Sequence, residues 1–212
     1  MNKYDYVFLS MIYAPIYPIF LFLVGWWVSI PLVPENQIFI FALAGLALGV
    51  VIDVIFLKRV LVFGYGLKMI IMVAIYLFYS AGIFGFFMGV PIFNVLLGIF
   101  AAIYIARRAS LSKWDNARFR RNLDHTARFA VAVLLLICIE SAYLALSDTH
   151  TANNISGMLG LNFEITTDVL WGIVIVGGLV LLGFQYWIVR FVGAKTAGYL
   201  EKKILLAKRN QV

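Results

Sequence analysis

The chain has 212 residues, of which 64% are hydrophobic and 13% are charged, and its formal net charge is +7. Soluble domains average about 45–50% apolar and about 25% charged residues. A soluble fold of this length could not bury so much apolar surface, because folded proteins keep a polar-rich exterior. The composition therefore predicts an all-α, polytopic integral membrane protein whose main partner is the lipid bilayer.

Six segments have the length and composition expected of membrane spans, for which about 20 predominantly apolar residues are needed. We expect them to form one transmembrane domain over residues 1–212. The predicted spans cover residues 6–30, 38–57, 67–88, 91–106, 127–146 and 169–191. The fourth is short, since its length corresponds to about 24 Å of helix. We therefore expect it to continue into the basic segment that follows, or to lie where the bilayer is thinner.

The positions of lysine and arginine predict the orientation of these spans. All 17 basic residues lie on one side, before the first span or around the loops and span ends that follow the even-numbered spans, and the loops after the first, third and fifth spans contain none. Cytoplasmic loops carry an excess of Lys and Arg. We therefore expect six spans with both termini in the cytoplasm. The net positive charge is a topology signal with attraction to anionic inner-leaflet lipids, and it does not indicate nucleic-acid binding.

Three segments outside the spans complete the predicted organisation: a basic cytoplasmic loop at residues 107–126, an outer loop at 147–168 and a basic cytoplasmic tail at 192–212. Outer loops of such length usually have a function or lack order. The generally compact loops favour a prokaryotic cytoplasmic membrane. The arginines expected to contact lipid headgroups are Arg107, Arg108, Arg118, Arg120 and Arg121.

Reactive groups are sparse. The single cysteine, Cys138, cannot form an internal disulfide or a thiolate metal site, and His125 and His150 lie in different predicted loops. We therefore expect no metal site, no cofactor and no catalytic residue. An intramembrane lipid-modifying enzyme stays a remote alternative.

Glu140 is the first candidate for function, because it lies about two thirds of the way across the fifth predicted span. A carboxylate at that depth is costly unless it is protonated, paired or hydrated, so exposure to lipid is disfavoured. One interpretation is a proton or cation site, or a ligand anchor, in an outward cavity. The other is a protonated carboxyl that is hydrogen-bonded to a neighbouring helix through Ser80, Asn94 or a tyrosine.

Asp53 is the second acidic candidate and lies toward the cytoplasmic end of the second span. Long basic side chains can extend along a helix toward such an acid. One interpretation is an ion pair with Arg59, Lys68, Arg107 or Arg108. The other is a relay partner to Glu140 on the inner side, as a proton pathway would need two acids at different depths.

Proline and glycine mark two further features of the spans. Pro15 and Pro18 break the hydrogen-bond ladder of the first helix, which either kinks it or exposes carbonyl groups to a ligand. Small residues at four-residue spacing allow close helix packing, either within the chain or in a homodimer. The glycines with this role are Gly45 and Gly49 in the second span and Gly85 and Gly89 in the third.

Two classes of function remain open from the sequence. The first is a small transporter or a solute-binding membrane subunit for a small solute or cation, supported by Glu140, the interrupted first helix and the long outer loop. The alternative is a non-catalytic scaffold or accessory subunit that docks a partner subunit through its basic cytoplasmic face. An intramembrane enzyme is less favoured, because no serine–histidine pair or paired-aspartate site is visible.

Overall fold

The computed structural model describes residues 2–87, 89–148 and 166–209, together with positions 151, 154 and 156. These residues are almost entirely helical and include no strand, which confirms the all-α prediction. In this part of the chain six helical segments are long and apolar enough to cross a membrane, as expected. They are Lys3–Ser29, Glu35–Gly66, Met69–Phe86, Pro91–Leu111, Asn116–Ser147 and Asp168–Lys203.

The chain divides into two compact units, Met1–Ile71 and Met72–Val212. The first unit contains α1 (Lys3–Tyr13), α2 (Ile16–Ser29), α3 (Glu35–Phe63) and the 3-10 turn η1 (Gly64–Gly66). The second contains most of α4 (Met69–Phe86), η2 (Pro91–Phe93), α5 (Asn94–Leu111), α6 (Asn116–Ser147) and α8 (Thr167–Arg209).

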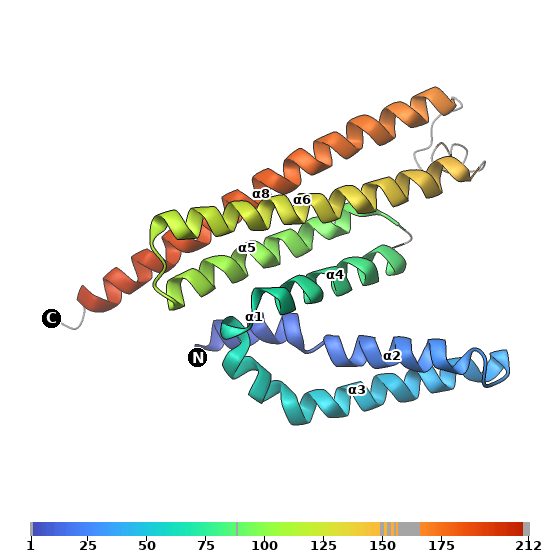
Figure 1. The fold of residues 1–212 in the computed structure, drawn as a ribbon, viewed down its shortest axis with the longest axis horizontal. Coiled ribbons are helices and arrows are strands. Elements are labelled where there is room, and N and C mark those ends of the chain that lie inside the picture. Colours follow the sequence, from blue (N-terminus) through green and yellow to red (C-terminus); the bar gives the residue numbers. More distant parts are fainter. Residues whose placement is uncertain are drawn as a thin grey trace. The chain divides into compact units, whose positions relative to one another are not determined.

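In the first unit, α2 and α3 form an antiparallel pair joined by a short connection (Figure 1). The glycines of α3 allow the two backbones to approach closely. A Cβ atom at Gly49 would lie only 2.5 Å from the Cα of Pro18, and one at Gly45 would overlap the carbonyl of Leu21. The structure therefore places this glycine pair in packing within the chain.

The first helix of this unit is held against the far end of α3. The Tyr13 hydroxyl donates a 2.9 Å hydrogen bond to the carbonyl of Gly64, and the Tyr65 hydroxyl donates a 3.2 Å bond to Asp5. Gly64 has no side chain, which leaves room for Leu9 against η1. Contacts at this end fix α1 independently of the packing between α2 and α3.

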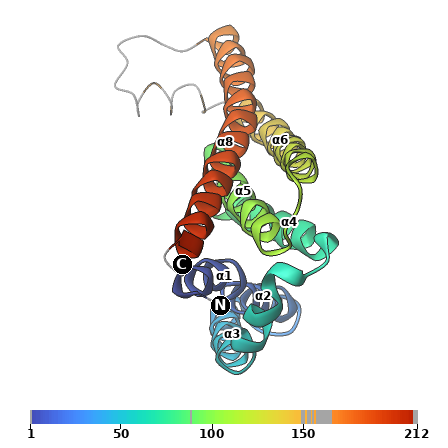
Figure 2. The ribbon, with the colours of Figure 1, turned by 90° about the vertical axis from the view of Figure 1, so that its left-hand side faces the viewer.

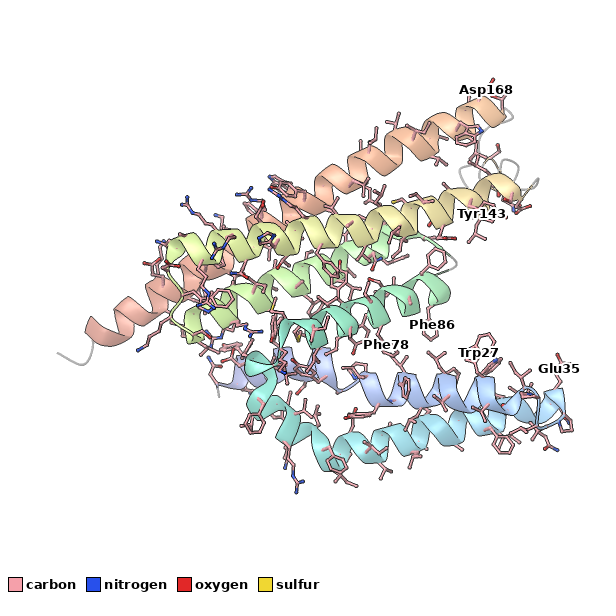
Figure 3. All side chains as sticks on the ribbon, in the orientation of Figure 1. Trp27, Glu35, Phe78, Phe86, Tyr143 and Asp168 are labelled. Atoms are coloured by element: carbon pink, nitrogen blue, oxygen red, sulfur yellow. The ribbon has the colours of Figure 1, made fainter. Side chains whose placement is uncertain are left out.

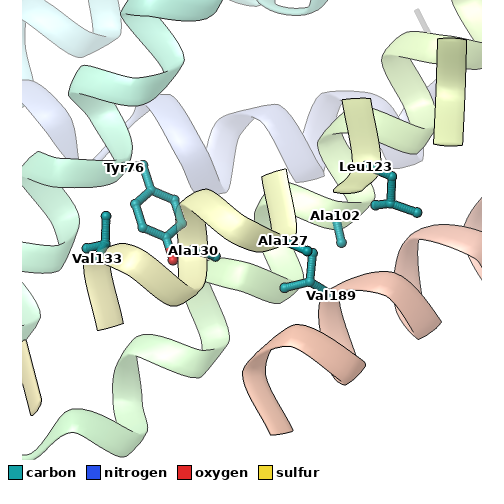
Figure 4. Close-up of a cluster of buried hydrophobic side chains, with 7 residues drawn as sticks. All are labelled: Tyr76, Ala102, Leu123, Ala127, Ala130, Val133 and Val189. Carbon is teal, nitrogen blue, oxygen red and sulfur yellow. The ribbon is translucent and has the colours of Figure 1, made fainter. Parts of the chain in front are cut away.

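In the second unit, α5, α6 and α8 form a bundle in which α5 and α8 run in the same direction and α6 runs opposite to them (Figures 1 and 2). The buried core combines small residues with branched aliphatic ones (Figure 4). Its members are Tyr76, Ala102, Leu123, Ala127, Ala130, Val133 and Val189. Alanines on α5 and α6 let these two helices pack closely. Tyr76 connects α4 to the core, because its ring packs edge-on against that of Phe129 with the ring centroids 5.2 Å apart.

The predicted basic loop at 107–126 is mostly helix. α5 continues to Leu111, and α6 begins at Asn116 after a turn in which Lys113 has φ +50°. The amide of Trp114 donates a hydrogen bond to the carbonyl of Ala109. This is the pattern of a C-terminal helix cap in which one residue, here Lys113, has the left-handed conformation. The Asp115 carboxylate then accepts a 2.9 Å hydrogen bond from the amide of Arg118 and caps α6.

The arginines expected at lipid headgroups therefore lie on two helices instead of one loop. Arg107 and Arg108 are partly buried in the last turns of α5, whereas Arg118, Arg120 and Arg121 are exposed in the first turns of α6. Arg118 also lies over the ring of Trp114, at 4.8 Å. Figure 3 shows nitrogen-bearing side chains gathered at this end of α6, with Tyr143 and Asp168 at the opposite end of the same unit.

The two remaining segments differ in how far the structure describes them. The predicted tail is helical through Arg209, where α8 ends, well beyond the apolar part of that helix. The predicted outer loop at 147–168 lies mostly outside the described residues.

Candidate functional site

A group of polar side chains lies inside the helix bundle of the second unit. Asn94, at the first position of α5, is 2% exposed, and Gln185 of α8 is fully buried. Ser80 of α4 is also buried, and its hydroxyl donates a 3.1 Å hydrogen bond to the Oδ1 atom of Asn94. Ser80 and Asn94, both predicted as candidates, are thus brought together by two helices that are adjacent in sequence.

Most of the hydrogen-bonding capacity of this group is unused. The Nδ2 atom of Asn94 and both the Nε2 and Oε1 atoms of Gln185 are buried without a partner among the described residues. A buried donor or acceptor without a partner costs about 1–3 kcal/mol, and the large majority of such atoms in folded proteins are satisfied by protein or water. Asn94 and Gln185 therefore keep unused hydrogen-bonding groups among the described residues.

Gly98 makes room for Gln185. A Cβ atom at Gly98 would overlap the amide nitrogen of Gln185 and lie 2.9 Å from a methyl group of Val189. Gly98 lies one helical turn after Asn94, on the same face of α5. Gln185 therefore lies in the interface between α5 and α8, about one turn of α5 from the position of Asn94.

A cavity of about 500 Å³ opens in the same unit between η2, α6 and α8. Its walls include Pro91, three residues before Asn94, and Leu181, four residues before Gln185. The cavity therefore ends about one helical turn from both amides, which are not themselves part of its wall. Its volume falls within the range of about 300–1,000 Å³ that is typical of small-molecule sites.

The polar groups of the cavity are few. The Ser141 hydroxyl lies 2.7 Å from the carbonyl of Ile137 and also contacts the carbonyl of Gly89, so it bridges α6 to the α4–η2 connection. Asp148, Thr151 and Cys138 also line the cavity. Mostly apolar walls with a few polar groups are what a small-molecule pocket requires.

Glu140, the first candidate from the sequence, lies on an exposed face of α6. It is not among the residues that line the cavity, although its neighbours Cys138 and Ser141 are. Ser80 and Asn94, which were considered as its partners, bond to each other instead. The structure thus separates Glu140 from the buried polar group, and its functional role stays a prediction.

Asp53 lies in the first unit, on the face of α3 that packs within the chain. It is 7% exposed, and its Oδ1 atom is buried without a hydrogen-bond partner among the described residues. Within residues 2–71 no salt bridge reaches it, and Arg59 instead lies over the ring of Phe56, at 5.9 Å. The structure therefore gives Asp53 no ion pair with Arg59 or Lys68.

Pro15 and Pro18 lie where α1 ends and α2 begins in the first unit. α1 ends at Tyr13, Pro15 stands at the N-cap of α2, and Pro18 lies in the first turn of α2. The dihedral angles of Ala14 and Pro15 remain in the right-handed helical region. The interruption therefore removes hydrogen bonds while the backbone at Ala14 and Pro15 keeps helical dihedral angles.

The third-span glycines play different parts from those of α3. A Cβ atom at Gly85 would meet nothing within 4 Å in the described structure. Gly89 has φ +79°, a conformation that glycine adopts at little cost, in the turn that leads to η2. Gly89 therefore serves the turn, and the position of a Cβ atom on Gly85 is open among the described residues.

The sequence analysis did not select Gln185 or Gly98. Gln185 carried a usable signal, because it is the only amide side chain in the apolar stretch 169–191, and polar residues inside a span usually face the bundle interior. Gly98 carried no such signal, since a lone glycine in an apolar helix does not indicate which residue of another helix packs against it. Only the pairing of α5 with α8 reveals the two together.

The described residues contain no group of three or more histidine, cysteine or acidic side chains that could hold a metal ion. Comparisons with protein-family models, with curated proteins and with solved structures found no match. The inferred chemistry of the site therefore depends on the geometry of this chain alone.

Proposed function

We propose that this chain is an integral membrane protein with six spans and cytoplasmic termini that binds a small polar solute in its second unit and carries it across the membrane. The observation that supports this function is the set of buried, unpartnered amide atoms of Asn94 and Gln185. An amide both donates and accepts hydrogen bonds without a charge. The preferred solute is therefore uncharged and offers both donors and acceptors.

The cavity beside the amides supplies an entry route. It is lined by Asp148 among other residues and ends about one turn from Asn94 and Gln185. A solute that reaches the amides replaces the hydrogen bonds it leaves in water, because three amide atoms are free to bond it. An apolar molecule of the same size would leave these atoms unsatisfied and bind less well.

Native mass spectrometry of the chain, extracted gently into lipid nanodiscs from its own host membrane, tests this function. We expect a small-molecule adduct on the wild type that is absent from Gln185→Met. The matched control is Gln37→Met, because Gln37 is exposed in the first turn of α3. An adduct that persists in Gln185→Met would place the ligand elsewhere and refute the amide site.

The cavity carries a natural reporter, because Cys138 is the single cysteine of the chain and lies in its wall. Removal of the bound solute by extensive washing should speed the reaction of Cys138 with a small maleimide. Returning the extracted solute should slow the reaction again. A labelling rate that is unchanged by the solute would contradict entry through this cavity.

A second function is favoured by the exposed arginines at the start of α6. Arg118, Arg120 and Arg121 form a basic surface that suits an acidic partner subunit or anionic lipid headgroups. A stoichiometric partner protein in the same mass spectrum, without a small-molecule adduct, would support an accessory subunit in place of a transporter.

A further inference from the structure

The first unit contains a buried acid that the solute site does not use. Asp53 is 7% exposed, and one of its carboxylate oxygens has no partner among the described residues. An ionised carboxylate in such surroundings is strongly destabilising unless a counter-charge lies beside it. Within residues 2–71 no salt bridge supplies that charge.

The register of the α2–α3 pair places Asp53 opposite the helix break. Gly45 packs against Leu21, and Gly49, one turn later in α3, packs against Pro18, one turn earlier in α2. Continuing by one more turn along each antiparallel helix pairs Asp53 with Ala14. Ala14 is the residue at which α1 gives way to α2.

The break also frees backbone oxygens. Pro15 and Pro18 have no N–H group, so the carbonyls of Met11 and Ala14 lose the donors that a regular helix would provide four residues later. By this register, the carboxylate lies at the level of the turn that holds both carbonyls. Hard cations prefer such oxygen ligands, and interrupted membrane helices can supply them.

We propose that Asp53, with the carbonyl groups of Met11 and Ala14, binds a monovalent alkali cation the size of Na⁺. One positive charge neutralises the single carboxylate, whereas a divalent ion would leave a net charge buried among apolar helices. A proton would neutralise Asp53 but could donate a hydrogen bond to only one of the two carbonyls. A sodium-sized ion can be coordinated by all three groups.

The cation site is independent of the solute site, because it lies in the first unit and shares no residue with the amides of the second. If the protein binds the cation but no solute, or a solute but no cation, the proposal that fails can be told from the one that holds. If it binds both, the cation would be the ion whose movement drives transport of the solute, an inference that rests on the proposed function.

Thermal unfolding of the full chain in nanodiscs tests the cation site, with sodium chloride compared against choline chloride at the same ionic strength. A ligand that binds only the folded state raises the melting temperature as its concentration rises. We expect sodium to stabilise the wild type and to have no effect on Asp53→Asn. The control is Glu35→Gln, an exposed acid of the same unit, which should respond as the wild type does.

A second variant tests the role of the backbone. Pro18→Ala restores the N–H group that would bond to the carbonyl of Ala14, while it keeps the Cα atom that packs against Gly49. We expect the sodium concentration for half-maximal stabilisation to rise by about tenfold, which is what loss of one charge-assisted ligand produces. This variant also carries the test if Asp53→Asn fails to fold.

Three outcomes would overturn the cation site. They are a wild type that does not respond to sodium, an Asp53→Asn variant that responds fully, and a Pro18→Ala variant with unchanged sodium dependence. A wild type that is stabilised by lower pH but not by sodium would identify Asp53 as a protonated acid and would equally refute it.

Discussion

Gly49 and Gly85 show how the same residue type meets different surroundings in two helices of one chain. A Cβ atom at Gly49 would meet the backbone of α2, which cannot rotate away as a side chain can. A Cβ atom at Gly85 would meet nothing within 4 Å in the described structure. The spacing of small residues in the sequence is similar in both helices, so the difference comes only from the neighbouring helix.

We predict that Gly49→Val lowers the free energy of unfolding by about 1–3 kcal/mol, the usual range for an overpacked contact. Gly85→Val should change it by less than about 0.5 kcal/mol, as substitutions in open positions do. Thermal unfolding of both purified variants in nanodiscs would measure the difference. Equal losses of stability in the two variants would contradict the close approach of α2 and α3.

The polar residues of the predicted spans also divide into buried and exposed ones according to the neighbouring helices. Ser80, Asn94, Asp53 and Glu140 were selected because polar groups in apolar spans are costly. The structure buries the first three and leaves Glu140 exposed on α6. Sequence spacing alone could not divide them, since the buried face of a helix depends on which helices pack against it.

At the scale of elements, the turn between α5 and α6 is defined by its hydrogen bonds. Lys113 has φ +50°, and the amide of Trp114 bonds back to Ala109. A residue with a Cβ atom is strained by about 1–2 kcal/mol in this left-handed conformation, whereas glycine adopts it freely. Lysine at this position therefore retains avoidable strain.

We predict that Lys113→Gly raises the free energy of unfolding by up to about 1 kcal/mol, because relief of strain is offset in part by the greater freedom of glycine in the unfolded chain. The control is Lys195→Gly, which places glycine inside the regular helix α8 and should lower stability by a similar amount. Chemical denaturation of the two variants measures both changes. A destabilised Lys113→Gly variant would mean that the turn has another conformation.

In the described residues, the six segments long enough to span a membrane followed from the sequence, and α5 continues to Leu111, which is one of the two expectations for the fourth span. The start of α6 at Asn116 did not follow, because the predicted fifth span begins only where the apolar residues begin. Arginine and lysine are good helix formers, so a helix continues through a basic segment that no longer fits the lipid interior. Apolar length thus locates a membrane span but not the end of its helix.

At the scale of the whole molecule, the positions of lysine and arginine predict which ends of the helices face the cytoplasm. In a Cys138→Ser background, we expect single cysteines introduced at Glu35 or Asp168 to react with a membrane-impermeant maleimide on intact cells. A cysteine introduced at Ser112 should react only after the cells are opened. Labelling at Ser112 from outside would contradict the proposed orientation.

The division into two units and the pairing of α5 with α8 could not be predicted from sequence spacing. Both depend on contacts between segments far apart in the chain, such as Gly98 with Gln185. The single glutamine of the last span carried a local signal, but its partner glycine lies in another helix. The candidate site was therefore half visible, through Ser80 and Asn94, before the fold was known.

The most direct test of the proposed amide site is the stability of Gln185→Met after all bound solute has been removed. If the buried amide lacks a partner in the empty protein, an apolar side chain of similar length should raise the free energy of unfolding by about 1–3 kcal/mol. Chemical denaturation in the same lipid mixture would measure this, with Gln37→Met as the control. A more stable variant that no longer binds solute is the predicted result, and a less stable one would show that Gln185 is held by the protein itself and contradict the proposed site.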